Sequence, residues 1–156
     1  IDYLPFTTKH AATLHKVTAM MYDKKIAIVI KSDLPDWQKL NVAAFLASAV
    51  AIQFPETHGQ AFTNASGSTY FPFVKHPMLI YKADTAEQIK RAFTRAKERA
   101  LHIGIYTEPL FSTKNEEGNH FEIAKHTDDD MPLVGLVLYG ENKKVDKALD
   151  GLKFHP

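Results

Sequence analysis

The chain of 156 residues is long enough for one domain with a substantial core and too short for two full domains. The 19 Lys and Arg residues against 18 Asp and Glu leave a net charge of +1, which excludes a polybasic protein that binds nucleic acid or membranes through its overall field. With 45% hydrophobic and 24% charged residues, the chain is neither disordered nor fibrous. The absence of Cys excludes disulfides, thiolate nucleophiles and iron–sulfur clusters.

Residues 1–22 allow two interpretations. Apolar side chains recur there at spacings of three and four, as on one face of a helix: Ala11, Leu14, Val17 and Met21. The segment is then either a first helix of the domain or an N-terminal extension. We predict an extension over residues 1–22 and a single domain over residues 23–156, because residues 26–30 are the earliest with a buried-core pattern.

The first predicted strand covers residues 26–30, IAIVI, an uninterrupted run typical of a strand that is buried on both faces and central in a sheet. Asp36 is expected to cap a helix from residue 37 to about residue 53. The expected buried stripe of this helix consists of Leu40, Ala44, Ala47, Val50 and Ala51. Residues 58–74 are irregular and indicate a loose hairpin or an excursion.

The second half of the chain continues the alternation of strands and helices. Strands are predicted over residues 77–83, 103–107 and 133–139, and helices from 86 to about 102 and over 143–152. Thr85 is the expected N-cap of the first of these helices, whose buried face is Ile89, Phe93, Ala96 and Ala100. A polar insertion over residues 112–130 is expected to hold a short helix around residues 121–125.

This order predicts an α/β fold, a three-layer α/β/α domain with a small mixed, mainly parallel sheet and helices on both of its faces. Open α/β sheets bind ligands at the carboxyl ends of their strands. Because the strands from Ile26 and Ile103 are expected to be parallel, residues 31–39 and 107–113 should meet at one edge and form one cleft.

Several common catalytic motifs are missing from the chain. It has no GxGxxG turn, Walker loop, GxSxG elbow or HExxH pair, so the usual signals of dehydrogenases, NTPases, serine hydrolases and zincins are absent. The grouping of His120, Glu122, His126 and Asp128 matches no standard ligand spacing, and a solvated acidic loop is the favoured interpretation. We expect no metal and no cofactor.

Two features suggest contact with RNA, and each has a simpler explanation. Arg91, Arg95 and Arg99 repeat every four residues and would form one phosphate-contacting stripe, although an ordinary exposed helix face is the favoured interpretation. Trp37, the only tryptophan, is either a stacking platform for a base or, the favoured alternative, a packed residue in the first turn of its helix.

The most informative segment runs from residue 25 to residue 51. Its strand delivers Lys31, Ser32 and Asp33 to a carboxyl end, and the following helix starts with Trp37, Gln38, Lys39 and Asn41. Such a set could orient a water molecule with Asp33 and stabilise an oxyanion with Lys39. The alternative is that Asp33 caps a turn and Lys39 is solvated.

At these residues the chain resembles the bacterial domain-of-unknown-function family 2000. The resemblance covers about residues 25–156 and rests on four motifs in the family's order: DLPxWQKLNVxAFL, IYTxxLFxT, VGLxLxG and GLxxHP. That family is similar in fold to type 2 peptidyl-tRNA hydrolases, which cleave the ester between a peptide and the terminal ribose of tRNA. The resemblance implies the same small mixed sheet between helices.

The resemblance also implies site residues. Lys31, Ser32, Asp33 and Leu34 match the basic, small polar, Asp-Leu sequence that follows the first strand of the hydrolases. Residues 35–41 replace their glycine- and lysine-rich stretch, with Lys39 as the nearest counterpart of its first lysine and Asn41 in place of the second. Phe45 replaces a glutamine, and the second hydrolase motif is matched loosely by Glu108, Ser112 and Thr113.

Two functions are therefore expected for one cleft. The first is a hydrolase acting on an ester or related bond of an anionic, tRNA-like or nucleotide substrate, with Asp33, Lys39 and Glu108 as catalytic residues. The second is a non-catalytic module that binds a nucleotide, an RNA end or a protein. The expected binding residues are Lys31, Ser32, Trp37, Asn41, Ser112 and Thr113. The expected partners are a small anionic ligand or an RNA end, with a homodimer as a further candidate.

The sequence also leads to expectations about location. Charges interrupt every apolar run well before the roughly 20 residues that a bilayer requires. No basic segment followed by an apolar core resembles a signal peptide near the start of the chain. We therefore expect no membrane association and a cytoplasmic location.

Overall fold

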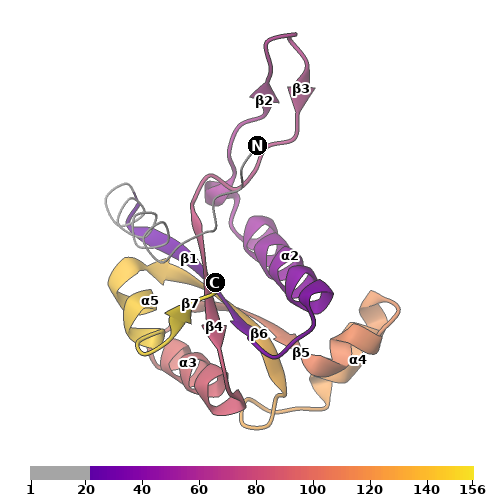
Figure 1. The fold of residues 1–156 in the computed structure, drawn as a ribbon, viewed down its shortest axis with the longest axis vertical. Helices are drawn as coiled ribbons and strands as arrows, with labels where there is room; N and C mark the ends of the chain where they lie inside the picture. The colour runs from indigo at the N-terminus through magenta and orange to yellow at the C-terminus, as the bar shows by residue number, and fades with distance from the viewer. Residues whose placement is uncertain (1–21) are drawn as a thin grey trace.

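A five-stranded mixed sheet forms the centre of the domain. In the computed structural model, which describes residues 22–156, the strands lie in the order β5-β6-β1-β4-β7 (Figure 1). Their bounds are Lys24–Lys31 for β1, Met78–Ala83 for β4, His102–Thr107 for β5, Leu133–Glu141 for β6 and Lys153–Phe154 for β7. The IAIVI strand is central, as its pattern predicts. The helix or extension expected in residues 1–21 lies outside the described residues.

The strand directions differ from the expected mainly parallel sheet. Three of the four strand pairs are antiparallel, and only β1 and β4 run parallel. The expectation is wrong because the long connection from β5 to β6 does not cross a face of the sheet: it returns at the same edge, with Thr107 opposite Leu133. Since β1 and β5 are both antiparallel to β6, they nevertheless run in the same direction.

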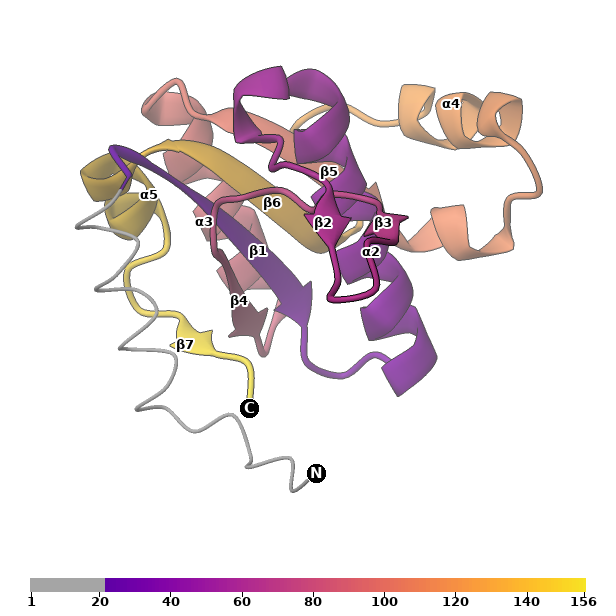
Figure 2. The same cartoon turned by 90° about the horizontal axis from the view of Figure 1, so that it is seen from above.

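Helices pack on both faces of the sheet (Figure 2). Helix α2 (Asp36–Gln53) covers one face, whereas α3 (Ala86–Glu98) and α5 (Asn142–Ala148) cover the other. Side chains of a strand point alternately to its two faces, so Ile26, Ile28 and Ile30 of β1 pack towards α2 and Ala27 and Val29 pack towards α3 and α5. All five are almost fully buried, which explains the uninterrupted apolar run.

Helix α2 buries a different stripe from the one expected. Its buried residues are Val42, Leu46 and Val50, whereas Leu40 is exposed. The helix packs closely on the sheet at Gly135 of β6, where an added Cβ would lie only 2.3 Å from Cγ1 of Val42. Pro35 is the N-cap and Asp36 lies within the first turn, so the expected capping by Asp36 is wrong.

Helix α3 begins as predicted and ends early. The hydroxyl of Thr85 accepts a hydrogen bond from the backbone N–H of Gln88 at 3.1 Å, which is the expected N-cap. The helix ends at Glu98, and Ala100 follows with a left-handed φ of 51°. Ala100 is therefore exposed, and Ala92 takes its expected place in the buried face beside Ile89, Phe93 and Ala96.

The remaining elements lie in the connections. A 3-10 turn, η1 (Pro55–Thr57), leads into a hairpin of β2 (Phe62–Thr63) and β3 (Thr69–Tyr70). A second 3-10 turn, η2 (Glu108–Ser112), precedes helix α4 (Glu116–Ala124), which starts five residues earlier than the short helix predicted there. No helix within residues 22–156 is long and apolar enough to span a membrane.

Candidate functional site

The carboxyl ends of β1 and β4 bring together part of the predicted site. Ser32 donates a hydrogen bond from its hydroxyl to Oδ1 of Asp84 at 2.7 Å, and Nζ of Lys82 lies 3.3 Å from the same oxygen. The hydrogen bond from Ser32, followed by the interactions with Lys82, lowers the pKa of the Asp84 carboxyl. Asp84 is therefore a carboxylate anchored by its neighbours, and the sequence analysis missed it although it directly follows a predicted strand.

Asp33, the expected catalytic carboxylate, is an exposed turn residue. Its Oδ2 lies 3.6 Å from Nζ of Lys31, the preceding cation at the end of β1. The Asp33 side chain is largely solvent-exposed, and it lines neither the pocket nor the groove described below. An exposed pair of this kind contributes little stability.

An aromatic pocket of about 520 Å³ lies between the start of α2, the end of β5 and the connection through η2 to α4. Its aromatic side chains form a continuous series of ring contacts. The Trp37 and Phe111 rings meet edge to face with centroids 5.9 Å apart, and the Phe111 and Tyr106 centroids lie 5.0 Å apart. Tyr106 in turn lies 6.1 Å from Phe45. The wall formed by these four rings is apolar and suited to a flat ligand.

Amide and hydroxyl groups line this pocket as well. They are the side chains of Asn41, Thr113, Asn115 and Asn119. The Thr113 hydroxyl donates to the carbonyl oxygen of Leu110 at 2.9 Å and also hydrogen-bonds the side chain of Asn119. Asn115 caps α4 by accepting the N–H of Gly118 at 2.8 Å. Lys114 and Glu116 add one positive and one negative charge among the lining residues.

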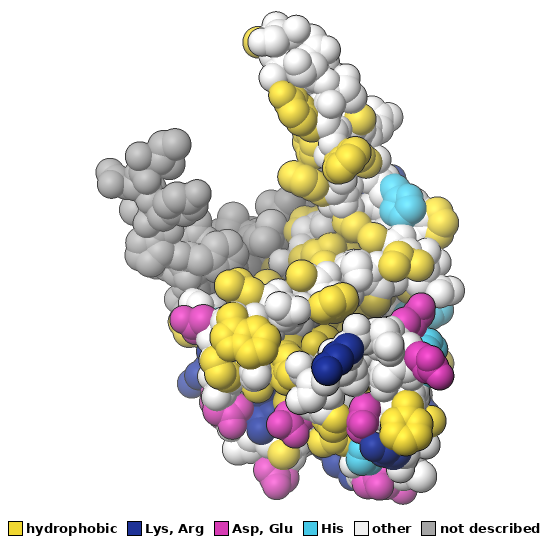
Figure 3. Space-filling model, turned by 90° about the vertical axis from the view of Figure 1, so that its right-hand side faces the viewer, with side chains coloured by type: hydrophobic (Ala, Val, Ile, Leu, Met, Phe, Trp, Pro, Cys, Tyr) yellow, Lys and Arg dark blue, Asp and Glu magenta, His cyan; other side chains and the backbone are white. Residues whose placement is uncertain are grey.

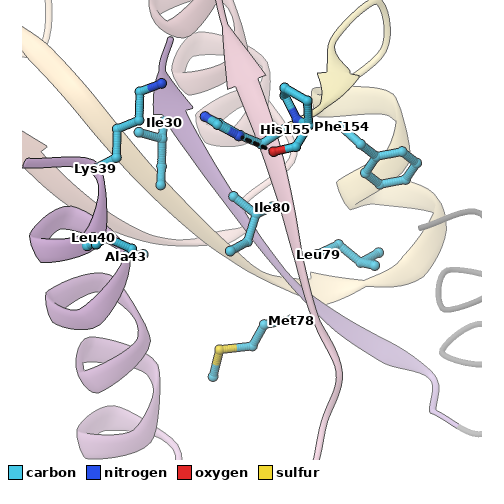
Figure 4. A pocket seen from close by; sticks show the side chains of 10 residues that line it. Ile30, Lys39, Leu40, Ala43, Met78, Leu79, Ile80, Phe154 and His155 are labelled. Atoms are coloured by element: carbon cyan, nitrogen blue, oxygen red, sulfur yellow. Dashed lines mark hydrogen bonds between the residues drawn. The ribbon is translucent and has the colours of Figure 1, made fainter. Parts of the chain in front are cut away.

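Lys39 lies on the other side of α2, in a separate groove of about 390 Å³ (Figure 4). The groove runs between α2, β4 and the C-terminal residues, with Leu40, Met78 and Ile80 among its mostly apolar lining. Trp37 and Asn41 are four residues apart and share one side of the helix, whereas Lys39 is two residues from each and is rotated by roughly 200°. No Asp or Glu side chain lines this groove in the described part of the chain.

The predicted site residues therefore do not share one cleft. Trp37, Asn41 and Thr113 line the aromatic pocket, and Lys39 lines the separate groove. Glu108 and Ser112 are exposed in η2 and line neither cavity. Residues 37–41 are neighbours along the chain, but the helix distributes their side chains around its axis. The rings of Phe45, Tyr106 and Phe111 were missed, although all three lie within the motifs that carry the family resemblance.

The comparisons with known proteins identify a family. The family model described as a protein of unknown function, DUF2000, matches residues 24–156. The chain belongs to this family. A search of curated proteins found none that matches. The chain is also similar to the solved structure of Atu0240, a protein of unknown function from Agrobacterium tumefaciens strain C58, at 33% identity and a TM-score of 0.84, over 87% of this chain and all of that one.

In this family member two of the three arginines of the basic stripe, Arg95 and Arg99, make contacts within the chain. Arg95 donates to the carbonyl oxygen of Asp150 at 3.0 Å, and Arg99 donates to that of Arg95 at the same distance. On the same helix, Lys90 and Lys97 bind the loop at Asp128 and Asp129. These contacts fasten the loop and the C-terminal region to α3, and contact of the stripe with RNA stays a prediction.

In the segment that holds His120 and His126, each histidine lies near a carboxylate four residues away in the chain. Nε2 of His120 lies 3.6 Å from Glu116, and Nδ1 of His126 lies 3.6 Å from Asp130. The backbone N–H of Thr127 bonds the Asp130 carboxylate and is the main cause of its lowered pKa. Over residues 22–156, no three His, Asp or Glu side chains are grouped in a way that could hold a metal ion.

Proposed function

We propose that this protein binds a small planar ligand of the nucleobase or nucleoside class in the aromatic pocket. The observation that carries the proposal is the pairing of an aromatic wall, which includes Trp37 and Phe111, with the amides of Asn41 and Asn119. Flat heteroaromatic rings stack on aromatic side chains, and their polar edges pair with amides. A volume of about 520 Å³ lies within the usual range for a small-molecule site.

Charge favours a nucleoside over a polyphosphate. Lys114 and Glu116 are the charged residues that line the pocket, and their charges balance. A ligand with several negative charges would approach Glu116 without a surplus of cations to compensate it. The terminal nucleoside of an RNA carries the same chemistry as a free nucleoside, so both are included in the proposal.

Binding without catalysis is the better supported function. A hydrolase would need Asp33, Lys39 and Glu108 around one reacting centre. Lys39 lines a groove to which no Asp or Glu side chain of the described residues contributes, whereas Asp33 and Glu108 are exposed outside both cavities. The three-layer type 2 peptidyl-tRNA hydrolase fold stays a proposal, for which helices on both sheet faces and the resemblance of residues 31–34 speak. Hydrolase activity stays a prediction from that resemblance alone.

The single tryptophan offers a direct test. Nucleosides, their monophosphates and a short RNA oligonucleotide are titrated into the protein while the fluorescence of Trp37 is followed. We expect a saturable change with at least one nucleoside, and about fivefold weaker binding by Asn41→Ala, because loss of one hydrogen bond costs about 1 kcal/mol. A response to the oligonucleotide alone would identify an RNA end as the ligand.

Two variants serve as controls. Gln53→Ala removes an amide from the last turn of the same helix, outside the pocket, and should bind as the wild type does. Lys39→Ala should also keep its affinity, because Lys39 lines the other groove. Absence of any saturable change, or equal affinities of the wild type and Asn41→Ala, would contradict the proposal.

A further inference from the structure

A hairpin arm projects from the body of the molecule. The arm consists of residues 59–74, with β2 and β3 paired only to each other (Figure 1). Its root is held by the N–H of Gly59, which donates to the carbonyl oxygen of Phe73 at 2.8 Å, and an added Cβ on Gly59 would lie 2.5 Å from that oxygen. At its tip, the Asn64 side chain accepts the N–H groups of Ser66 and Ser68. Hydrogen bonds therefore hold the arm both at its root and at its tip.

The composition of the arm is unusual for a segment in water. Residues 59–74 contain no charged side chain. Its four large aromatic side chains are between 49% and 92% exposed: Phe62, Tyr70, Phe71 and Phe73. A two-stranded hairpin that projects alone is marginally stable in water. Exposed aromatics without surrounding charge are typical of the buried centre of a protein interface.

The outer face of α2 likewise exposes apolar side chains and carries no charge. Leu40 and Ile52 are 71% and 80% exposed, and the residues between them on this face are small: Ala44, Ser48 and Ala51. No charged residue occurs from Leu40 to Pro55. In the space-filling view the arm and the body just below it are mainly yellow and white, and charged side chains gather lower on the body (Figure 3).

We propose that two copies of this chain form a symmetric dimer in which each arm packs on the outer face of α2 of the other copy. A two-fold interface must be self-complementary, and this chain carries both a projecting apolar arm and an apolar face. The absence of charge favours a permanent contact between identical subunits over a transient one, since permanent interfaces resemble a domain core.

The exposed area is sufficient for a stable dimer. At 150–250 Å² for each aromatic side chain, the exposed parts of the four rings amount to roughly 500 Å² on one arm. Two arms and the two faces that they cover would bury roughly 2,000 Å² in total, which reaches the size of stable protein interfaces. Covering the arm would also remove its aromatic rings from water.

Sedimentation velocity and light scattering of the full chain over a wide range of concentrations test the dimer. We expect twice the mass of one 17.6 kDa chain for the wild type. Phe71→Glu on the arm and Ile52→Glu on the helix should each give monomers, because a buried unpaired charge opposes association. Phe121→Glu is the matched control: Phe121 is 65% exposed on α4, away from both surfaces, so this variant should remain dimeric.

Mixing the two monomeric variants tests the contact itself. The intact α2 face of Phe71→Glu can receive the intact arm of Ile52→Glu, so the mixture should associate although neither variant does so alone. A monomeric wild type would overturn the proposal, and so would a dimer that both substitutions leave intact. Circular dichroism verifies that each variant is folded, as expected for changes at such exposed positions.

Discussion

His76 is a nearly buried histidine in an aromatic setting, with its ring 4.3 Å from that of Tyr22 and 6.0 Å from that of Tyr139 between centroids. Its Nδ1 has no hydrogen-bond partner among the described residues. Burial, followed by the charge of Lys75, lowers the pKa of His76 from 6.5. The folded state therefore holds this ring neutral in a range where the unfolded chain would protonate it.

This shift predicts a pH dependence of stability. The unfolded chain binds more protons at His76 than the folded chain, so this contribution to stability is present above pH 6.5 and is lost as the pH falls towards the lower pKa of the folded state. We expect the free energy of unfolding to decrease less on acidification in His76→Phe than in the wild type, as measured by urea titrations at a series of pH values. Parallel curves for the wild type and His76→Phe would refute the assignment.

At the scale of single elements, capping determines where helices begin and a change of backbone conformation determines where they end. The sequence predicts Thr85 as an N-cap because a hydroxyl residue precedes an amphipathic run, and the structure confirms it. In the structure the side chain of Gln88 also accepts the backbone N–H of Asp84 at 2.6 Å. The end of α3 was missed because Ala100 gives no sequence signal for its left-handed conformation. Local rules thus predicted the start of this helix and not its end.

The capping role of Thr85 can be measured. Thr85→Ala removes the acceptor of the Gln88 N–H and should lower the free energy of unfolding by about 1 kcal/mol. Thr85→Ser keeps a hydroxyl at the same place and should lose much less. Urea unfolding of the two variants gives the comparison, and equal losses would show that the methyl group, rather than the hydroxyl, stabilises the helix start.

For the whole molecule, the fold begins at Tyr22 at the latest. The carbonyl oxygen of Tyr22 accepts the side-chain amide of Asn142 at 2.6 Å, and its hydroxyl donates to the carbonyl oxygen of Lys75 at 3.3 Å. The family model starts two residues later, at the first residue of β1. Tyr22 thus ties the start of β1 to two segments that are distant in the sequence.

Removal of residues 1–21 tests the predicted domain boundary. We expect the shortened chain, starting at Tyr22, to remain folded and to melt cooperatively, because the central strand and its neighbours remain complete. A chain that starts at Asp23 should melt at a lower temperature, since it lacks the contacts of Tyr22 with Asn142 and Lys75. Insolubility of the first variant, or a loss of several kcal/mol in its stability, would show that residues 1–21 belong to the core.

Local sequence patterns predict most of the separate elements and indicate the family. The run from Ile26 to Ile30 predicts a central strand because every residue in it is apolar, and both faces of that strand are covered. The hydroxyl of Thr85 predicts a helix start for an equally local reason. The motifs from DLPxWQKLNVxAFL to GLxxHP indicate the family, which the match over residues 24–156 shows.

The way in which these elements combine depends on contacts between distant parts of the chain. The sheet is mainly antiparallel because the chain between β5 and β6 returns at the same edge of the sheet. Neither the length nor the polarity of this connection predicts that return. Lys25 is fully buried with its Nζ 2.7 Å from Asp146, a contact across 121 positions of the chain. Trp37 and Lys39 line different cavities because they lie on different sides of the same helix, α2. Strand and helix patterns depend on neighbours in the chain, whereas a site depends on which distant surfaces meet, and long-range packing alone determines that.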